Sequence, residues 1–189
     1  MPSRIEPLAL PLGEEHASMM KKWMPPLPGV DPLALFRVLL RNPKLSEKMR
    51  PLGAFQLSRE SSLTIRDREL AIDRTCARCR CEYEWGVHAA LMGAAAGFDS
   101  AAIAATVTGD ANNPVWSDRD RCLISLVDSL HDSGTLSDEL WQGILQYWTQ
   151  EQALELAILC GFYHAISFVA NMAGLAPEAW ATRFPARPE

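Results

Sequence analysis

Apolar residues recur at helical spacing along most of the chain from position 31 onward. Between positions 33 and 40, Leu33, Phe36 and Leu40 are three or four residues apart, as on one face of a helix. Similar patterns cover 45–59, 65 onward, 117–134 and 137–148, and no segment alternates apolar and polar residues as a half-buried strand does. The pattern therefore predicts an all-α chain, a single-domain helical bundle of seven to nine helices around one core.

Polar residues and prolines mark where several of these helices begin. Candidate N-caps are the Asp31–Pro32 pair, Thr64, Ser117 with Asp120, and Thr149. The stretch that Thr149 opens, QEQALELAILCGFYHAISFVANMAG, is apolar nearly all round, which is typical of a central or subunit-buried helix. In RTCARCRCEYEW, by contrast, neither Gly nor Pro marks the end of one helix and the start of the next.

The N-terminal thirty residues differ from the rest of the chain. They hold six of its 13 prolines, namely Pro2, Pro7, Pro11, Pro25, Pro26 and Pro28. We expect an extended arm with one short helix around 14–23, packed on the body of the protein or on a neighbouring subunit. Residues 31–189 are expected to form one helical domain, since 189 residues match the usual size of one domain.

Composition excludes several function classes. The 18 basic and 23 acidic residues give a net charge of -5 and the basic ones are scattered, so no nucleic-acid partner is expected. The N-terminus has neither the apolar run of a signal peptide nor the length of a membrane span, so we expect a cytoplasmic protein. The five cysteines are an odd number, and three lie between positions 76 and 81, which favours reduced thiols over a disulfide framework.

The segment RELAIDRTCARCRCEYEWGVH concentrates groups that can move protons. If the chain is helical from Cys81 onward, Cys81, Glu84 and His88 share one stripe. An imidazole titrates near neutral pH, and a carboxylate one turn away would orient it and raise its pKa, so His88 is a candidate general base or proton relay. Cys81 would be a nucleophile only as a thiolate, which a helix N-terminus and two neighbouring arginines would favour.

Glu69 heads a second stripe in the same segment. Ile72, Asp73 and Cys76 follow it on one helix face, so the carboxylate is expected to be partly buried. Burial would raise the pKa of Glu69 and make it a candidate proton carrier. The alternative is a buried structural ion pair with an arginine such as Arg66 or Arg74.

The spacing of this segment resembles the core motif of the carboxymuconolactone decarboxylase superfamily, which includes the alkyl hydroperoxidase D (AhpD-like) proteins. Their redox branch has a glutamate, a cysteine twelve residues on, a second cysteine three later and a histidine four after that. On this chain these positions are Glu69, Cys81, Glu84 and His88, so a glutamate replaces the second cysteine. The resemblance extends through YEWGVHAALMGAAAGF and FYHAISFVANMAGL and implies an AhpD-like bundle that assembles as a trimer or hexamer.

Glu84, at the position of the second cysteine of the redox branch, changes the activity that the resemblance implies. The redox branch reduces hydroperoxides with a dithiol that cycles through a disulfide, which Glu84 cannot form. The decarboxylase branch is attributed acid–base chemistry on ring lactones without a cofactor. We therefore expect Glu84 and His88 to move protons on a small carboxylated or lactone substrate, with Glu69 as relay and Cys81 as accessory. The substrate pocket is expected near Tyr83 and Trp85, and Tyr163 and His164 of the last helix either line it or pack in the core.

Three alternatives remain open. A thiol peroxidase could use Cys81 with Cys79, or the displaced pair Cys76 and Cys79. A zinc site from Cys76, Cys79, Cys81 and His88 has enough ligands, but such crowding suits tetrahedral geometry poorly, so neither a metal nor any other cofactor is predicted. The third alternative is a non-catalytic helical binding or assembly module. His16 and His131 are expected at the surface.

Overall fold

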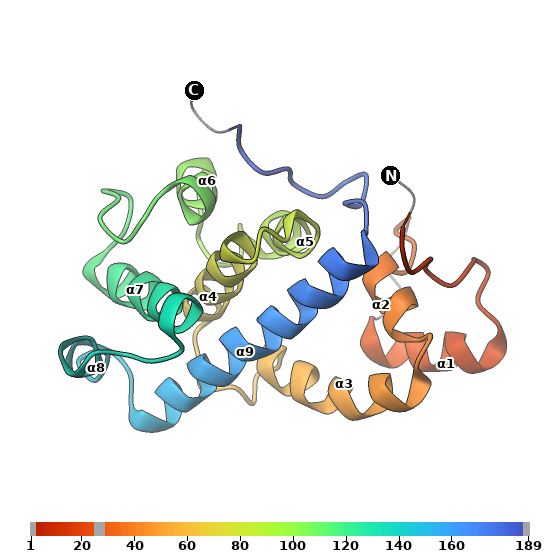
Figure 1. The fold of residues 1–189 in the computed structure, drawn as a ribbon, viewed down its shortest axis with the longest axis horizontal. Helices are drawn as coiled ribbons and strands as arrows, with labels where there is room; N and C mark the ends of the chain where they lie inside the picture. The colour runs from red at the N-terminus through yellow and green to blue at the C-terminus, as the bar shows by residue number, and fades with distance from the viewer. Residues whose placement is uncertain (1–2, 25–28, 187–189) are drawn as a thin grey trace.

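The computed structural model describes residues 3–24 and 29–186, and within these ranges the chain forms nine helices and no strand. The predicted all-α class is confirmed. The helices are α1 (Glu14–Trp23), α2 (Ala34–Leu39), α3 (Pro43–Leu57), α4 (Ile65–Arg78), α5 (Glu82–Met92), α6 (Ser100–Thr108), α7 (Asp118–Ser133), α8 (Asp138–Ile144) and α9 (Gln150–Ala173), arranged as in Figure 1.

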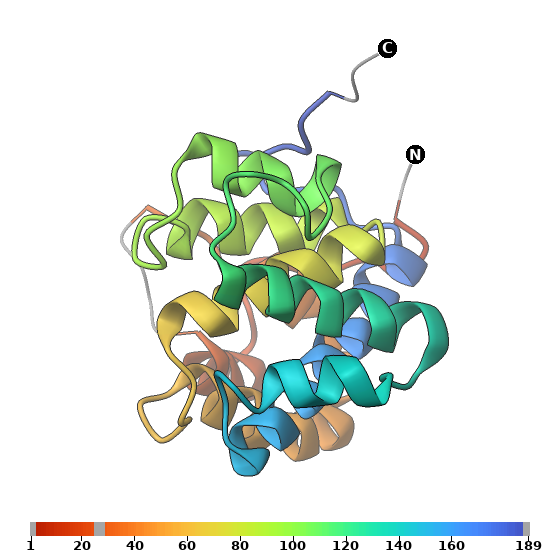
Figure 2. The same cartoon turned by 90° about the vertical axis from the view of Figure 1, so that its left-hand side faces the viewer.

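Helix α4 lies at the centre of the bundle. It packs against α5, α6, α7 and α9, and every residue from Asp67 to Cys76 is buried. Figure 2, which brings α7 and α8 to the front, shows α4 behind α7 and flanked by α5. A helix covered on all sides must bury its polar residues too, so each of them needs a partner or must be neutral.

Most of the expected caps form. The Thr64 and Thr149 side chains accept hydrogen bonds at the first turns of α4 and α9, and Ser117 with Asp120 makes the predicted capping box of α7. Two boundaries differ from the prediction. The Asp31–Pro32 pair lies before α2, whose N-cap is Leu33, and α8 stops at Ile144 although the pattern runs to position 148.

The boundary between α4 and α5 depends on one unusual residue. Cys79 is the C-cap of α4, Cys81 is the N-cap of α5, and Arg80 between them has φ of 53°. A left-handed conformation costs a residue with a Cβ atom about 1–2 kcal/mol. Since arginine rarely adopts it, the sequence carried no turn signal at this position.

The N-terminal arm packs on the body. The Arg4 amide donates to the Ala173 carbonyl at 2.7 Å, the Trp23 indole nitrogen of α1 donates to the Ser46 hydroxyl at 2.8 Å, and the rings of Trp23 and Phe36 are 5.1 Å apart. The predicted short helix coincides with α1. Residues 1–2 and 25–28, which hold four of the arm's prolines, and residues 187–189 lie outside the described ranges.

Helix α9 crosses the bundle as a core helix. In the described part of the chain it is the one helix with the length and hydropathy of a membrane span, with a mean hydropathy of 1.7 in an 18-residue window of which 44% is buried. It packs against α2, α3, α4, α5 and α7, and a core helix of a soluble protein meets the same criteria. Of the two positions predicted for this helix, central or subunit-buried, these contacts show the central one.

The C-terminal segment closes over α5 at Gly86. The Thr182 amide donates to the Gly86 carbonyl at 3.1 Å, and a Cβ atom on Gly86 would lie 2.3 Å from the Thr182 carbonyl oxygen. We expect Gly86→Ala to displace this segment and lower the free energy of unfolding by about 1–3 kcal/mol, as overpacking does. Urea denaturation measures the change.

Gly143→Ala is the matched control for that variant. Its Cβ atom would make ordinary contact with the Cys122 sulfur at 3.7 Å, and alanine favours a helix by up to about 1 kcal/mol over glycine. Equal stabilities of Gly86→Ala and the wild type would contradict the tight packing at Gly86.

Candidate active site

His88 and Glu69 meet in the core. His88 Nδ1 lies 2.7 Å from Glu69 Oε2, and both side chains are buried. The other oxygen of Glu69 is 3.6 Å from the Arg68 guanidinium nitrogen Nε. The buried carboxylate therefore lies between a cation on its own helix and the imidazole of α5.

The second ring nitrogen of His88 faces Tyr163 and Glu84. Its Nε2 lies 3.1 Å from the Tyr163 hydroxyl and 3.5 Å from Glu84 Oε1. The Tyr163 ring stands edge-on to the imidazole with the ring centres 5.1 Å apart. The carboxylates of Glu69 and Glu84 thus lie at opposite ring nitrogens of one histidine.

The two glutamates keep His88 protonated. Burial by itself lowers the pKa of an imidazole, but the charge and hydrogen bond of Glu69, together with Glu84, outweigh it and raise the pKa of His88 to about 10. His88 is therefore an imidazolium at neutral pH, and both of its N–H groups donate. Burial and the same glutamates raise the pKa of Tyr163 well above its usual value, so Tyr163 keeps its hydroxyl proton.

Asp73 of α4 is a further buried acid close to this group. It is 1% exposed, and neither of its oxygens has a hydrogen-bond partner in the described residues. Burial raises the pKa of this carboxyl well above its usual range, with the nearby Glu69 and Glu84 adding to the effect, and this favours its protonated form. The ionisable groups around His88 are therefore Glu69, Glu84, Asp73 and Arg68.

A cavity of about 300 Å³ reaches His88 from the surface. Its walls are largely apolar and come from α1, α2, α3, α5 and α9, with Trp23, Leu35, Phe36, Val87, Phe162 and Ile166 among them. Glu84, His88 and Tyr163 line it as well, as do the exposed Lys22 and half-buried Arg50. A mostly apolar pocket with a few convergent polar groups is typical of a small-molecule site.

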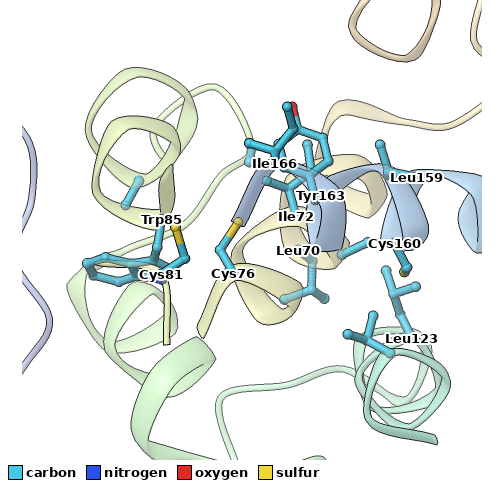
Figure 3. Close-up of a cluster of buried hydrophobic side chains, with 14 of the residues drawn as sticks. Leu70, Ile72, Cys76, Cys81, Trp85, Leu123, Leu159, Cys160, Tyr163 and Ile166 are labelled. Atoms are coloured by element: carbon cyan, nitrogen blue, oxygen red, sulfur yellow. The ribbon is translucent and has the colours of Figure 1, made fainter. Parts of the chain in front are cut away.

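The thiols lie outside this cavity. Cys76 and Cys81 are fully buried, and Figure 3 shows them in the core near Trp85 and Ile72. The Ser167 hydroxyl lies 3.7 Å from the Cys76 sulfur, and Cys79 is half-buried at the end of α4. Burial raises the pKa of Cys81 to about 11 despite its place at the N-terminus of α5, so it is a protonated thiol at neutral pH.

The structure corrects the expected positions of two aromatic residues, Tyr83 and Trp85. Tyr83 donates its hydroxyl to Glu178 at 2.6 Å, and the Trp85 indole donates to Thr106 at 2.9 Å, so both support the core and do not line the cavity. For His164 two positions were open, and the structure has the packed one: it does not line the cavity, its Nδ1 lies 2.9 Å from the Cys160 carbonyl oxygen, and it meets His131. Tyr163 alone of the four aromatic candidates lines the cavity. His164 is the next residue along α9 and is turned by about 100° around the helix axis, so it faces another side of the bundle.

The expected arginine partners of Glu69 are also corrected. Arg66 forms a bidentate pair with Asp120, and Arg74 forms one with Asp128, while Arg68 approaches Glu69. Sequence reasoning missed Arg68, Lys22 and Arg50, since no local pattern shows that α1 and α3 meet α5 around one cavity.

Comparisons with solved structures identify the fold. A peroxidase-related protein from Silicibacter sp. TM1040 aligns over 94% of each chain at a TM-score of 0.76 and 18% identity. A peroxidase-related protein from Ralstonia eutropha JMP134, described as an alkylhydroperoxidase AhpD core, covers 93% of each chain at 0.72 and 16%. The chain has the AhpD-like fold. The debrominase Bmp8 shares it, at a TM-score of 0.69 and 13% identity over 94% of this chain and 93% of that one.

The AhpD-like fold confirms the resemblance expected from the motif at the level of architecture. No protein-family model matches the sequence, and no curated protein matches it. At identities below 20%, the solved structures show the fold and leave the activity to be argued from the site.

Proposed function

We propose that this protein catalyses cofactor-free proton transfer on a small, mostly apolar carbonyl or lactone compound that carries a carboxylate. One observation carries the proposal: a protonated, buried histidine paired with Glu69 lines an apolar cavity that no cysteine lines. A positioned acid or base that touches substrate is the requirement of such catalysis.

Each polar group of the cavity has a role in the proposed reaction. His88 Nε2 donates a proton to the substrate, and Glu69 at Nδ1 stabilises the imidazolium and fixes its orientation. The Glu84 carboxylate accepts a proton, and the Tyr163 hydroxyl donates a hydrogen bond to a carbonyl oxygen. Lys22 and Arg50 supply positive charge for the carboxylate of the substrate.

The size of the cavity supports a small substrate. About 300 Å³ is at the lower end of ligand pockets and holds a compound of one ring. A Cys→Ala variant of the debrominase Bmp8, which aligns with this chain at a TM-score of 0.67 and 14% identity, was solved with 2,3,4-tribromopyrrole. That ligand has a single ring, which fits the substrate size proposed for this chain.

Solvent exchange tests the proposal without knowledge of the natural substrate. The protein would be incubated in D₂O with a panel of unsaturated lactone acids and small keto acids and followed by proton NMR. We expect deuterium incorporation next to the carbonyl, or decarboxylation, in at least one compound. A panel that shows neither, with protein of intact fold, would contradict the proposal.

A thiol peroxidase is the second candidate function. The names of two similar structures favour it, since both are described as peroxidase-related, and three thiols lie around the α4–α5 junction. If it holds, a hydroperoxide should oxidise Cys81 with Cys79, or Cys76 with Cys79, to a disulfide. Mass spectrometry would then show a loss of about two daltons that reductant reverses and Cys79→Ser abolishes. Unchanged mass would exclude it.

We also propose that this chain assembles with further copies of itself through α9. Helix α9 exposes the large apolar side chains of Leu154, Ile158, Phe168 and Met172, with exposed fractions of 68%, 53%, 63% and 57%. Their spacing is that of one heptad stripe, which can pack against the same stripe of a second copy. The trimer or hexamer implied by the family resemblance would cover it.

Light scattering tests that assembly. The double variant Leu154→Glu/Ile158→Glu is expected to reduce the solution mass to that of the monomer, because two carboxylates would be buried without partners. Leu45→Glu on α3, where the leucine is 48% exposed, should leave the mass unchanged. An unaltered mass of the double variant would exclude α9 as the interface.

A further inference from the structure

Three potential metal ligands converge on the side of α9 away from the cavity. Cys79 comes from the C-cap of α4, His131 from the last turn of α7 and His164 from the middle of α9. One ligand atom from each lies within 4.8 Å of the others, and His131 Nδ1 is 2.8 Å from His164 Nε2. The helices α4, α7 and α9 pack against one another, so the bundle itself brings these side chains together (Figure 1).

A backbone contact sets the tautomer of His164. Its Nδ1 lies 2.9 Å from the Cys160 carbonyl oxygen, and since a carbonyl only accepts, Nδ1 carries the proton and donates. The lone pair of His164 is then on Nε2, directed at His131. Metal-binding histidines are oriented in this way, with the remote N–H held by a carbonyl or carboxylate.

A hydrogen bond also fixes the backbone of Cys79 next to α9. The Asn171 side-chain amide donates to the Cys79 carbonyl at 2.9 Å and ties the end of α4 to α9. All three residues are half-buried, so a cation could enter from solvent and keep one position open. His131 also lines a polar cavity of about 490 Å³, so the cluster borders solvent-accessible space on that side.

The local charge permits a cation. Arg74, Arg78 and Arg80 all line that cavity, but Arg74 pairs with Asp128 and Arg78 pairs with Asp132. Each of these two arginines therefore has a carboxylate partner, and the carboxylate of Asp110 lines the cavity as well. Binding would add a thiolate, which further compensates the cation.

We propose that Cys79, His131 and His164 form a zinc site. Two imidazoles and one thiolate are ligands that Zn²⁺ prefers, and three protein ligands leave the fourth tetrahedral position for water or another small ligand. Zinc–ligand bonds of about 2.0–2.3 Å place the ligand atoms roughly 3.3–3.6 Å apart. The two histidine nitrogens must therefore separate by about 0.5 Å and the sulfur must approach, which rotation of half-buried side chains allows.

Cobalt titration tests the site directly. Protein without a histidine tag would be freed of metal with a chelator, kept reduced and titrated with Co²⁺. We expect one equivalent to produce the visible bands of a tetrahedral ion and a thiolate-to-cobalt charge-transfer band, both displaced by Zn²⁺. An excess of Zn²⁺ over its Kd should also raise the Tm of the wild type.

Variants assign the ligands. Loss of a group that merely supports a metal ligand lowers metal affinity by about 10–100-fold. Loss of a ligand itself should lower the Co²⁺ affinity at least as much, which we expect for His131→Ala, the milder His131→Asn and His164→Ala. Cys79→Ser should remove the charge-transfer band. The control Cys122→Ser/His16→Ala removes one cysteine and one histidine outside the cluster and should bind as the wild type does. Absence of a stoichiometric tetrahedral spectrum, or equal binding by His131→Asn and the wild type, would overturn the proposal.

Discussion

Replacement of His88 by glutamine is expected to reduce turnover of a substrate found by solvent exchange by about 10²–10⁴-fold, the usual contribution of a positioned acid or base. Glutamine keeps a hydrogen-bonding group next to Glu69 and Tyr163 but cannot donate a proton to the substrate as the imidazolium does. The rates of both proteins would be measured by proton NMR, with His16→Gln as the matched control because His16 does not line the cavity.

The pH dependence gives this prediction a second measurement. Because the pKa of His88 is raised to about 10, its proton-donating form persists from neutral pH up to that value. We therefore expect no loss of activity from His88 between pH 7 and 9 and a decline as the pH passes about 10. Full turnover in His88→Gln, or a decline centred near pH 6.5, would contradict the role assigned to His88.

Replacement of Glu69 by glutamine is expected to have the largest effect on stability. The variant leaves His88 buried without the carboxylate at 2.7 Å, and removal of one partner from a buried ion pair typically costs about 3–5 kcal/mol. It should also lower the pKa of His88, because burial then acts with less opposition. Urea denaturation would give the free energy of unfolding, and histidine NMR titration the direction of the pKa change.

The pH profile of stability separates this effect from a mere packing defect. The pKa of His88 is higher in the folded than in the unfolded protein, so its stabilising contribution is complete below about pH 6.5 and is lost as the pH rises through about 10. The free energy of unfolding of the wild type should therefore fall over that interval, and that of Glu69→Gln should fall less. Glu47→Gln, at an exposed position of α3, should follow the wild type. Parallel profiles of Glu69→Gln and the wild type would refute the ion pair.

Local sequence signals predicted most of the fold. Side chains at the first turns predicted the starts of α4, α7 and α9, because a cap satisfies the free N–H groups of its own helix and needs no tertiary contact. The break between α4 and α5 was not predictable in this way. Arg80 adopts a conformation that costs energy locally, and the packing of α4 against α5 must offset that cost.

The candidate site was predictable in its residue types and not in its contacts. The motif identified Glu69, Glu84 and His88 as residues of one segment, but whether His88 meets a carboxylate or a thiol depends on how α5 lies on α4. The packing places Glu69 against His88 and buries Cys76 and Cys81 away from the cavity. The cavity itself needs α1, α2, α3 and α9, which are distant in sequence.

The sequence by itself determined the helical class, most helix starts and the stripe of Cys81, Glu84 and His88, because periodicity, capping and spacing along one helix are local properties. Only the tertiary structure decided the protonation state of His88, since its pKa depends on a carboxylate 19 residues away on another helix and on burial by the whole bundle. The meeting of Cys79 with His131 and His164 was decided in the same way, by the packing of three helices.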